Sequence, residues 1–435
     1  MEIKEEKKKE EHIIQNFDSL ATNEERKLAL HIVEAGLNAI QPQQVLKNHF
    51  SFEYLQVKIE DKILNLRDFE RIFVVGFGKG AAGICKMLEN NLGDFLTGGF
   101  VIDVVDESFT KLKYTKGTHP LPSAENIKFT QEVLDTLTDL SQTDLVIVVI
   151  CGGGSAMFEV PYKITLETLI EINKALLKSG ANIAEMNIVR KHLSKVKGGG
   201  FAKHLYPASI VSLIFSDVPG NDLFVIASGP TINDPTTLAD VEEVINKYQL
   251  EDQVKLEESD FHETPKDEKY FSTVSNILIM SNLTALEAMK KKAEELGAPA
   301  FIYSDRIQGN SKHVGEELIN AAKHGHVLLA GGETTAKITG SGKGGRNQAL
   351  VLGALPFITD GVLIVSFDTD GLDFYGYAGA IGDSKTVKRA IDLGLDTKSF
   401  LDNDDSYTFF ERVGDGIMTG KLESNVSDLF IVIKL

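Results

Sequence analysis

The sequence predicts an α/β fold of two domains: a first domain built on a mostly parallel, doubly wound sheet, and a second, smaller α/β domain. Short apolar runs alternate with helix-like segments along most of the 435 residues, as they do where helices join the strands of a parallel sheet. Residues 251–270 are dense in charge and poor in apolar side chains. We therefore expect a domain at residues 1–250, a connecting segment at 251–270 and a second domain at 271–435.

Sequence signals support the elements of the first domain. Thr22 and Glu25 have capping-box spacing ahead of a helix that runs towards Ile40. Ser123 is the expected cap of a later helix, and Gly180 is the expected end of another. Apolar runs and helical spacing predict the rest: strands at 71–75, 99–105 and 145–150, and helices around 84–88, 166–177 and 187–197.

The second domain continues the alternation. A helix is expected from Thr284 to Leu296, where Gly297 ends it. Another helix opens after the glycine-rich run that ends at Gln348. The expected strands are 277–280, 300–303, 327–330, 361–367 and 429–433.

Composition excludes several classes of protein. Hydrophobic residues make up 43% and charged residues 25%, as in ordinary globular chains. A net charge of −18 argues against bulk affinity for nucleic acid or an anionic membrane. With Cys85 and Cys151 as the only cysteines, a disulfide scaffold or Cys-rich zinc site is not expected. Met1–His12 has no apolar core of a secretory signal, so we expect a cytoplasmic protein.

The first glycine-rich motif is Gly76-Phe77-Gly78-Lys79-Gly80-Ala81-Ala82-Gly83, between a strand and a helix. It resembles the dinucleotide-binding pattern, with Asp103 or Asp106 at the next strand end. A tight strand–helix turn without a ligand is the alternative. Lys79 favours a phosphoryl group over hydride chemistry.

A second glycine-rich turn, Gly152-Gly153-Gly154-Ser155, follows the apolar run 145–150. Its backbone N–H groups could line an anion, with Ser155 as a donor or helix cap. A nucleophilic Ser155 is the weaker reading, since the G-x-S-x-G elbow and a His partner are missing.

The segment after Glu185 is basic. Arg190, Ser194 and Lys197 share one helical face, while Val189 and its apolar partners form another. A phosphate or substrate role for Arg190 or Lys197 competes with a solvated polar face.

Acidic residues follow two other predicted strands. Asp217 could hold Mg²⁺ or orient a hydroxyl group, or could simply stabilise a turn. Asp368, Asp370 and Asp373 pose the same choice. His119, just before Pro120, is expected to be a structural hydrogen-bonding residue.

The run Gly342-Lys343-Gly344-Gly345-Arg346-Asn347-Gln348 enters a helix but is not a Walker A sequence, because its lysine precedes the glycine pair. Arg346 could clamp a carboxylate or a phosphate with two hydrogen bonds. A simple surface loop is the alternative.

The order of these motifs resembles the glycerate kinases that pair a Rossmann-like N-terminal domain with a C-terminal MOFRL domain. The resemblance runs from about Asn16 to the C-terminus and rests on nine ordered blocks. The blocks are Val75–Ala81, Thr118–Pro122, Gly152–Ala156, Asn187–Gly199, Ser216–Asp222, Ala227–Thr231, Gly331–Thr335, Gly344–Gln348 and Thr369–Gly371. Phe367-Asp368 and Asp373-Phe374-Tyr375 depart from the family pattern, where smaller residues are expected.

The resemblance implies phosphorylation of D-glycerate by ATP with Mg²⁺, in a cleft between the two domains, and it favours 2-phosphoglycerate as the product. Its proposed active-site lysine and arginine correspond to Lys79 and Arg346. We predict Lys79, Arg346 and Asp217 as catalytic residues and Asp217 and Asp370 as metal ligands. The predicted binding residues are Gly78, Gly152, Gly153, Gly154, Ser155, Arg190, Lys197, Glu333, Gly345 and Asp370.

Two other functions stay open. A nicotinamide-dependent hydroxypyruvate reductase would use the Gly76 motif, and a non-catalytic protein would bind ATP without turnover. The expected partners are the small-molecule substrates alone, with neither nucleic acid nor membrane. The sequence leaves the oligomeric state open, with a homodimer as one expectation.

Overall fold

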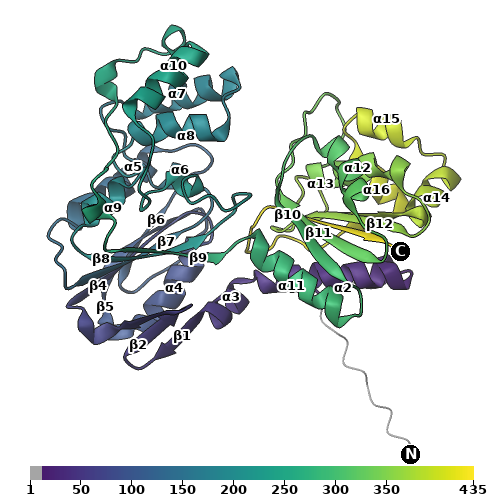
Figure 1. Cartoon of the computed structure of the whole chain (residues 1–435), viewed down its shortest axis with the longest axis horizontal. Coiled ribbons are helices and arrows are strands. Elements are labelled where there is room, and N and C mark those ends of the chain that lie inside the picture. Colours follow the sequence, from purple (N-terminus) through teal and green to yellow (C-terminus); the bar gives the residue numbers. More distant parts are fainter. Residues whose placement is uncertain (1–11) are drawn as a thin grey trace, which may run out of the picture. The chain divides into compact units, whose positions relative to one another are not determined.

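The computed structural model in Figure 1 describes residues 12–435, which form two compact units. One unit is continuous from Val45 to Ser281 and is named the middle unit. The other, the split unit, combines the chain up to Gln44 with Asn282–Leu435. We expect no secretory signal in Met1–His12, but of this segment only His12 belongs to the described residues. Within residues 12–435, no helix is both long and apolar enough to cross a bilayer.

The middle unit is built on a sheet of parallel strands in the spatial order β6-β5-β4-β7-β8-β9. This is the strand order of a doubly wound sheet, which confirms the fold class predicted for the first domain. The winding direction reverses between β4 and β7, and ligands of such sheets bind at the carboxyl ends of the strands at this reversal. The strands are β4 (Arg71–Phe77), β5 (Leu96–Asp103), β6 (Leu112–Lys116), β7 (Asp144–Ile150), β8 (Ser209–Phe215) and β9 (Val274–Met280).

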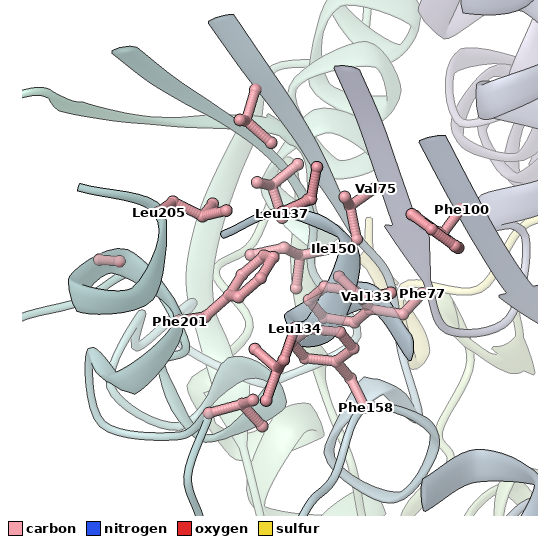
Figure 2. Close-up of a cluster of buried hydrophobic side chains, with 14 of the residues drawn as sticks. Val75, Phe77, Phe100, Val133, Leu134, Leu137, Ile150, Phe158, Phe201 and Leu205 are labelled. Atoms are coloured by element: carbon pink, nitrogen blue, oxygen red, sulfur yellow. The ribbon is translucent and has the colours of Figure 1, made fainter. Parts of the chain in front are cut away.

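Apolar side chains cover both faces of this sheet, because successive residues of a strand point to opposite sides. On one face Phe77 stacks on Phe158 with ring centroids 4.2 Å apart, and Phe201 packs edge-on against Phe158 (Figure 2). Burial of each such ring stabilises the fold by roughly 1.5–3 kcal/mol. On the other face Gly76 admits α4, since a Cβ atom there would lie 2.2 Å from Sγ of Cys85. The loops at the ends of β4 and β7 therefore rest on a closely packed core.

The helices of the middle unit form two groups. Those that flank the sheet are α4 (Ala81–Leu92), α5 (Ala124–Thr136), α6 (Gly154–Met157) and α9 (Gly200–Leu205). A second apolar cluster joins α7 (Leu166–Ser179), α8 (Ile183–His192) and α10 (Leu238–Tyr248). An antiparallel sheet, β1-β2-β3, comprises β1 (Phe50–Glu53), β2 (Gln56–Ile59) and β3 (Lys62–Asn65). The predicted caps Ser123 and Gly180 are both confirmed.

The split unit has a mixed sheet in the order β10-β11-β15-β12-β13-β14. Only the β10–β11 pair of this sheet is parallel. Its strands are β10 (Ala300–Ile307), β11 (His326–Gly332), β12 (Val362–Asp368), β13 (Gly379–Asp383), β14 (Gly416–Ile417) and β15 (Asp428–Lys434). Figure 1 shows α2 (Glu24–Ala39) and α11 (Asn282–Glu295) together beneath this sheet. The other helices are α1 (Phe17–Leu20), α12 (Ser311–Ala321), α13 (Arg346–Ala354), α14 (Ser384–Asp392), α15 (Thr397–Asp402) and α16 (Ser406–Val413), and α3 (Pro42–His49) crosses from one unit into the other.

The division differs from the predicted boundaries at residues 250 and 271. Strand β9, expected to open the second domain, pairs in parallel with β8 and completes the first sheet. Residues 251–270 do not form a free linker: Val254 and Phe261 are buried among α7, α8 and α10, and the Thr264 hydroxyl donates to Asp234. Apolar side chains spaced widely among charges are enough to hold this segment in place.

The N-terminal helix also belongs elsewhere than predicted. Arg26 of α2 is fully buried and forms ion pairs with Asp383 and Asp415, so α2 is part of the split unit. Its N-cap is Asn23, whose side chain accepts from the amide of Arg26, and not the predicted Thr22. The first difference arises from contacts with residues distant in sequence. The second arises from a choice between two adjacent residues that can both cap a helix.

Candidate functional site

Two glycine-rich loops meet at the winding reversal of the middle unit. The amide of Lys79 donates to the carbonyl of Gly152 (2.8 Å), and the amide of Cys151 donates to the carbonyl of Phe77 (3.0 Å). Gly78 has a φ of 109°, and a Cβ atom there would lie 2.4 Å from the Cys151 carbonyl oxygen. The two loops can come this close only because the position holds glycine.

The N-terminus of α4 is already occupied by an acid. Asp103, fully buried at the end of β5, accepts hydrogen bonds from the amides of Gly80 (2.9 Å) and Ala82 (3.0 Å). Burial raises the pKa of Asp103, and its hydrogen bonds with backbone amides oppose that shift. The amides that would hold a dinucleotide pyrophosphate are thus taken. Asp106 is exposed and pairs with Lys116. Asp103 thus ends the next strand, as predicted, but its carboxylate is engaged by the amides of α4.

Polar side chains border the Gly152–Gly154 turn. The Asp217 carboxylate lies over Gly152, where a Cβ atom would be 2.1 Å from Oδ2. The His119 ring lies over Gly153, whose Cβ atom would be 2.7 Å from its Cδ2. Lys79 is exposed, and among residues 12–435 its ammonium group has no hydrogen-bond partner. The structure therefore gathers Lys79, Asp217, Gly78 and the glycines 152–154 at one end of the sheet.

Ser155 is not a cap or an activated nucleophile in this arrangement. Gly153 is the residue preceding α6, and the Ser155 hydroxyl contacts the hydroxyl of Ser228 (2.9 Å). Ser228 donates in turn to Asn187 (3.1 Å). The Ser155 side chain does not cap α6, so the predicted cap role is wrong. No base among the described residues contacts Ser155, and its hydroxyl group links two loops by hydrogen bonding.

The two basic residues predicted to bind substrate have protein partners. Arg190 Nε donates to Asn173 Oδ1 of α7 (2.5 Å), and burial lowers the Arg190 pKa. Lys197 is 3% exposed and forms an ion pair with Glu159, which is 2% exposed. Burial lowers the pKa of Lys197 to about 7, although Glu159 lies in contact with its ammonium group. The predicted helix ends at His192, before Lys197, so the two side chains do not share a helical face.

The split unit holds a second cluster, centred on Arg346 at the start of α13. Its guanidinium forms ion pairs with Glu333 (2.7 Å), Asp428 (2.8 Å) and Asp368 (3.4 Å). Burial lowers the pKa of Arg346, but these carboxylates more than offset that effect and raise it. Burial also raises the pKa of Asp368, as do the neighbouring carboxylates Asp428 and Asp370. An anionic ligand can reach Arg346 only in competition with these acids.

Asp373 occupies the N-terminus of α13 as Asp103 occupies that of α4. It is buried and accepts from the amides of Asn347 (3.0 Å) and Gln348 (2.8 Å). A Cβ atom at Gly345 would lie 2.0 Å from the Asp373 carbonyl oxygen, so Gly345 makes room for this turn. Asp370, half-buried, accepts from the amide of Leu372 (2.9 Å).

Sequence reasoning missed two features of these clusters. Asp428, the first residue of β15, holds both Arg346 and Asn347. An acid directly before an apolar run was its only sequence signal. The expected hydrogen bonds of His119 are not seen: within the described chain its ring nitrogens have no hydrogen-bond partner. Residues 12–435 contain no group of three or more His, Cys, Asp or Glu placed to hold a metal ion.

Comparison with known proteins supplies independent evidence. Residues 28–259 match the family described as a domain of unknown function, DUF4147, and residues 326–428 match the MOFRL family. The glycerate 2-kinase of Pyrococcus horikoshii is 36% identical over 94% of this chain and 97% of its own. The crystal structure of glycerate kinase from Thermotoga maritima has a TM-score of 0.83 and 33% identity, covering 94% of this chain and 99% of that one. A relative from Agrobacterium vitis, 33% identical over 90% of this chain and 94% of its own, has a provisional name as a hydroxypyruvate reductase.

Proposed function

The chain belongs to the glycerate kinase family that joins a DUF4147 domain to a MOFRL domain, and we propose that it transfers the γ-phosphoryl group of ATP to D-glycerate, giving 2-phosphoglycerate. The observation that carries the proposal is the winding reversal of the middle unit. There, two interlocked glycine loops present Lys79, and the carboxylate of Asp217, from the loop after β8, lies over Gly152. Phosphoryl transfer depends mainly on positioning and charge stabilisation, which this arrangement can supply.

Lys79 is the proposed ligand of the transferring phosphoryl group. Its ammonium group is exposed, and its backbone is fixed by the hydrogen bond to Gly152. A lysine held in this way can stabilise charge that develops on phosphoryl oxygens. Gly78 and the glycines 152–154 are proposed to let substrate approach the backbone, and Ser155 fixes their turn.

Arg346 is proposed to act on the phosphoryl group or on the substrate carboxylate, with Glu333, Gly345 and Asp370 beside it. Since its guanidinium is held by carboxylates, it must exchange at least one ion pair to do so. Arg190 and Lys197 remain the weaker proposals for substrate binding, because both are engaged inside the protein.

Mg²⁺ is proposed to accompany ATP. Mg²⁺ is usually bound through one or two carboxylates together with phosphates and water, so the donor chemistry of Asp217 suits it, and Asp370 is the second choice. When bound, the ion would neutralise charge on the phosphate oxygens. Asp217 would hold it beside the Gly152 turn.

The reductase alternative is disfavoured by Asp103. Its carboxylate satisfies the amides of Gly80 and Ala82, which a nicotinamide dinucleotide would need for its pyrophosphate. The non-catalytic alternative has no comparable observation in its favour.

Product analysis tests the proposal. The protein is incubated with ATP, Mg²⁺ and D-glycerate, and phosphorus NMR identifies the product. We expect 2-phosphoglycerate and ADP. A parallel incubation with NADH and hydroxypyruvate should leave the NADH absorbance unchanged. ATP binding without phosphoglycerate would overturn the kinase in favour of a binding protein, and 3-phosphoglycerate would overturn only the regiochemistry.

We also propose a cytoplasmic enzyme with small-molecule partners. The net charge of −18 disfavours nucleic acids and anionic membranes, and both cysteines are free and buried. A homodimer stays a prediction, which light scattering on the purified protein tests.

A further inference from the structure

His119 lies at the proposed site, with its ring packed against the Gly152–Gly154 turn although the residue is exposed. Its ring lies against the α-carbon of Gly153, where a Cβ atom would be 2.7 Å from Cδ2 and 3.1 Å from Nε2. Gly153 has a φ of 77°, which also favours glycine. The residue is exposed, and in the part of the chain that the structure describes its ring nitrogens have no hydrogen-bond partner. They are therefore available to a ligand.

A buried asparagine fixes the loop that carries His119. Asn126, at 0% exposure, accepts from the amide of Thr118 (3.0 Å) and donates to the Thr118 carbonyl (2.9 Å). The same side-chain amide donates to the carbonyl of Ala156 in α6 (3.0 Å). These bonds tie the residue before His119 to the helix that follows the Gly152–Gly154 turn. The imidazole is thus held against this turn by the fold, without any bond of its own.

Two features of the surroundings favour the neutral form of the imidazole. Burial of the ring lowers the pKa of His119, and the positive charge of Lys79 lowers it further. The turn beneath it, Gly152–Ala156, carries no charged side chain. A neutral imidazole offers one acceptor nitrogen, next to a lysine that suits a phosphoryl group.

We propose that His119 is a catalytic residue that accepts the proton of the glycerate hydroxyl group during phosphoryl transfer. This rests on the proposed kinase function. The hydroxyl oxygen forms a bond to the γ-phosphorus, and the bond from that phosphorus to the β,γ-bridging oxygen breaks to release ADP. The hydroxyl proton passes to the imidazole and then to solvent, to which His119 is open. Asp217, over the neighbouring glycine, is the rival base.

Chemical rescue distinguishes the two bases. General base catalysis contributes about 10²–10⁴-fold, so we expect His119→Ala to lower kcat at least about 100-fold while KM for ATP changes by less than about threefold. Free imidazole should raise the kcat of His119→Ala at least about tenfold, because it can take the proton in place of the missing ring. It should not rescue Lys79→Ala or Asp217→Asn. His119→Asn, which can hydrogen-bond but cannot take the proton, should stay as slow as the alanine variant.

The controls separate this inference from the kinase proposal. His313→Ala removes an exposed histidine of α12 and should leave kcat unchanged. If the wild-type protein makes no phosphoglycerate, the kinase proposal itself fails. If the wild type is active and His119→Ala has normal kcat, or if imidazole rescues only Asp217→Asn, the role of His119 is overturned. Full activity in His119→Asn would reduce it to a positioning residue. Circular dichroism of each variant checks that the fold is intact, and His119→Gln replaces the alanine variant if that one unfolds.

Discussion

The carboxylate of Asp103 accepts a hydrogen bond from the amide of Gly80 at 2.9 Å, at the point where α4 begins. A second bond comes from Ala82, so one buried side chain satisfies two of the amides that a helix N-terminus leaves unpaired. The glycine-rich motif after β4 therefore shapes a turn, and its helix N-terminus is not an open anion site. In the proposed reaction, phosphate recognition therefore falls to side chains and not to these amides, and Lys79 projects from the same turn.

Replacement of Asp103 should affect stability and not cofactor choice. Asp103→Asn places an N–H donor against backbone donors, and loss of a buried charge-assisted bond costs about 1.5–3 kcal/mol. Urea denaturation should show this loss. Asp106→Asn, at an exposed carboxylate paired with Lys116, should change the free energy of unfolding by less than about 0.5 kcal/mol. A gain or loss of NADH binding in either variant would revive the dinucleotide hypothesis.

Lys79→Ala should slow phosphoryl transfer strongly without unfolding the protein. Its ammonium group is exposed, and the hydrogen bond that fixes its loop uses its backbone amide, which alanine retains. Loss of one charge-stabilising donor lowers kcat by about 10²–10³-fold or more. Coupled assay of ADP release and thermal denaturation measure the two effects. Lys128→Ala, on the exposed side of α5, is the matched control; turnover of Lys79→Ala close to that of this control would refute the assignment.

A methyl group at Gly152 should disturb Asp217 directly. The added Cβ atom would lie 2.1 Å from Oδ2 of Asp217, so the carboxylate must move. Misplacement by about 1 Å can cost about 10²-fold in rate, and we expect kcat of Gly152→Ala to fall by that order. Gly83→Ala is the control, because nothing lies within 4 Å of its Cβ position; within α4 it should add about 0.5–1 kcal/mol of stability and leave kcat unchanged. Equal activity of both variants would remove Asp217 from the mechanism.

Local patterns predict most elements of the middle unit and the place where its two glycine-rich loops meet. Apolar runs mark β4 and β7, and glycines directly after them mark the two loops that meet at the winding reversal. Parallel strands place their carboxyl ends at one edge of the sheet, so motifs distant in sequence come together there. This is why Lys79 and Asp217, taken from two separate motifs, lie at the same end of the sheet; their roles stay a prediction.

Contacts between distant segments could not be predicted in the same way. Arg26 and Asp383 are 357 residues apart, and nothing near Arg26 signals that α2 joins the split unit. For Lys197 the sequence predicts a substrate role or a solvated face, and it does not reveal the partner, Glu159, which lies before another helix. The use of Asp103 also depends on three-dimensional proximity, since a strand-end acid fits a ribose ligand and a helix cap equally well.

Lys197 should prove structural. Removal of one partner from a buried ion pair leaves the other charge unpaired, so Lys197→Met should destabilise the protein by about 3–5 kcal/mol. The double variant Lys197→Met with Glu159→Leu should recover most of that loss. KM for ATP and for D-glycerate should stay at the wild-type value in the folded variant. Lys195→Met, at an exposed position of the same loop, is the control; a tenfold rise in KM confined to Lys197→Met would instead assign it to substrate binding.

Arg26→Ala should destabilise the split unit in a way that depends on pH. Arg26 is fully buried, with Nε 2.7 Å from Asp383 and Nη1 2.6 Å from Asp415, and loss of the guanidinium leaves both carboxylates unpaired at a cost of about 3–5 kcal/mol. Burial raises the pKa of Asp383, but Arg26 more than offsets this, so the folded pKa lies below its ordinary value. A carboxyl group with a depressed folded pKa stabilises the protein above its unfolded pKa of about 3.9, and this contribution is lost as the pH falls through the lower, folded value. The difference in unfolding free energy between wild type and Arg26→Ala should therefore be largest near neutral pH and shrink below about pH 4.

Urea denaturation followed by far-UV circular dichroism at both pH values measures this difference, with Arg67→Ala at an exposed position of the middle unit as the control. A difference that is independent of pH would show that Arg26 acts through packing alone.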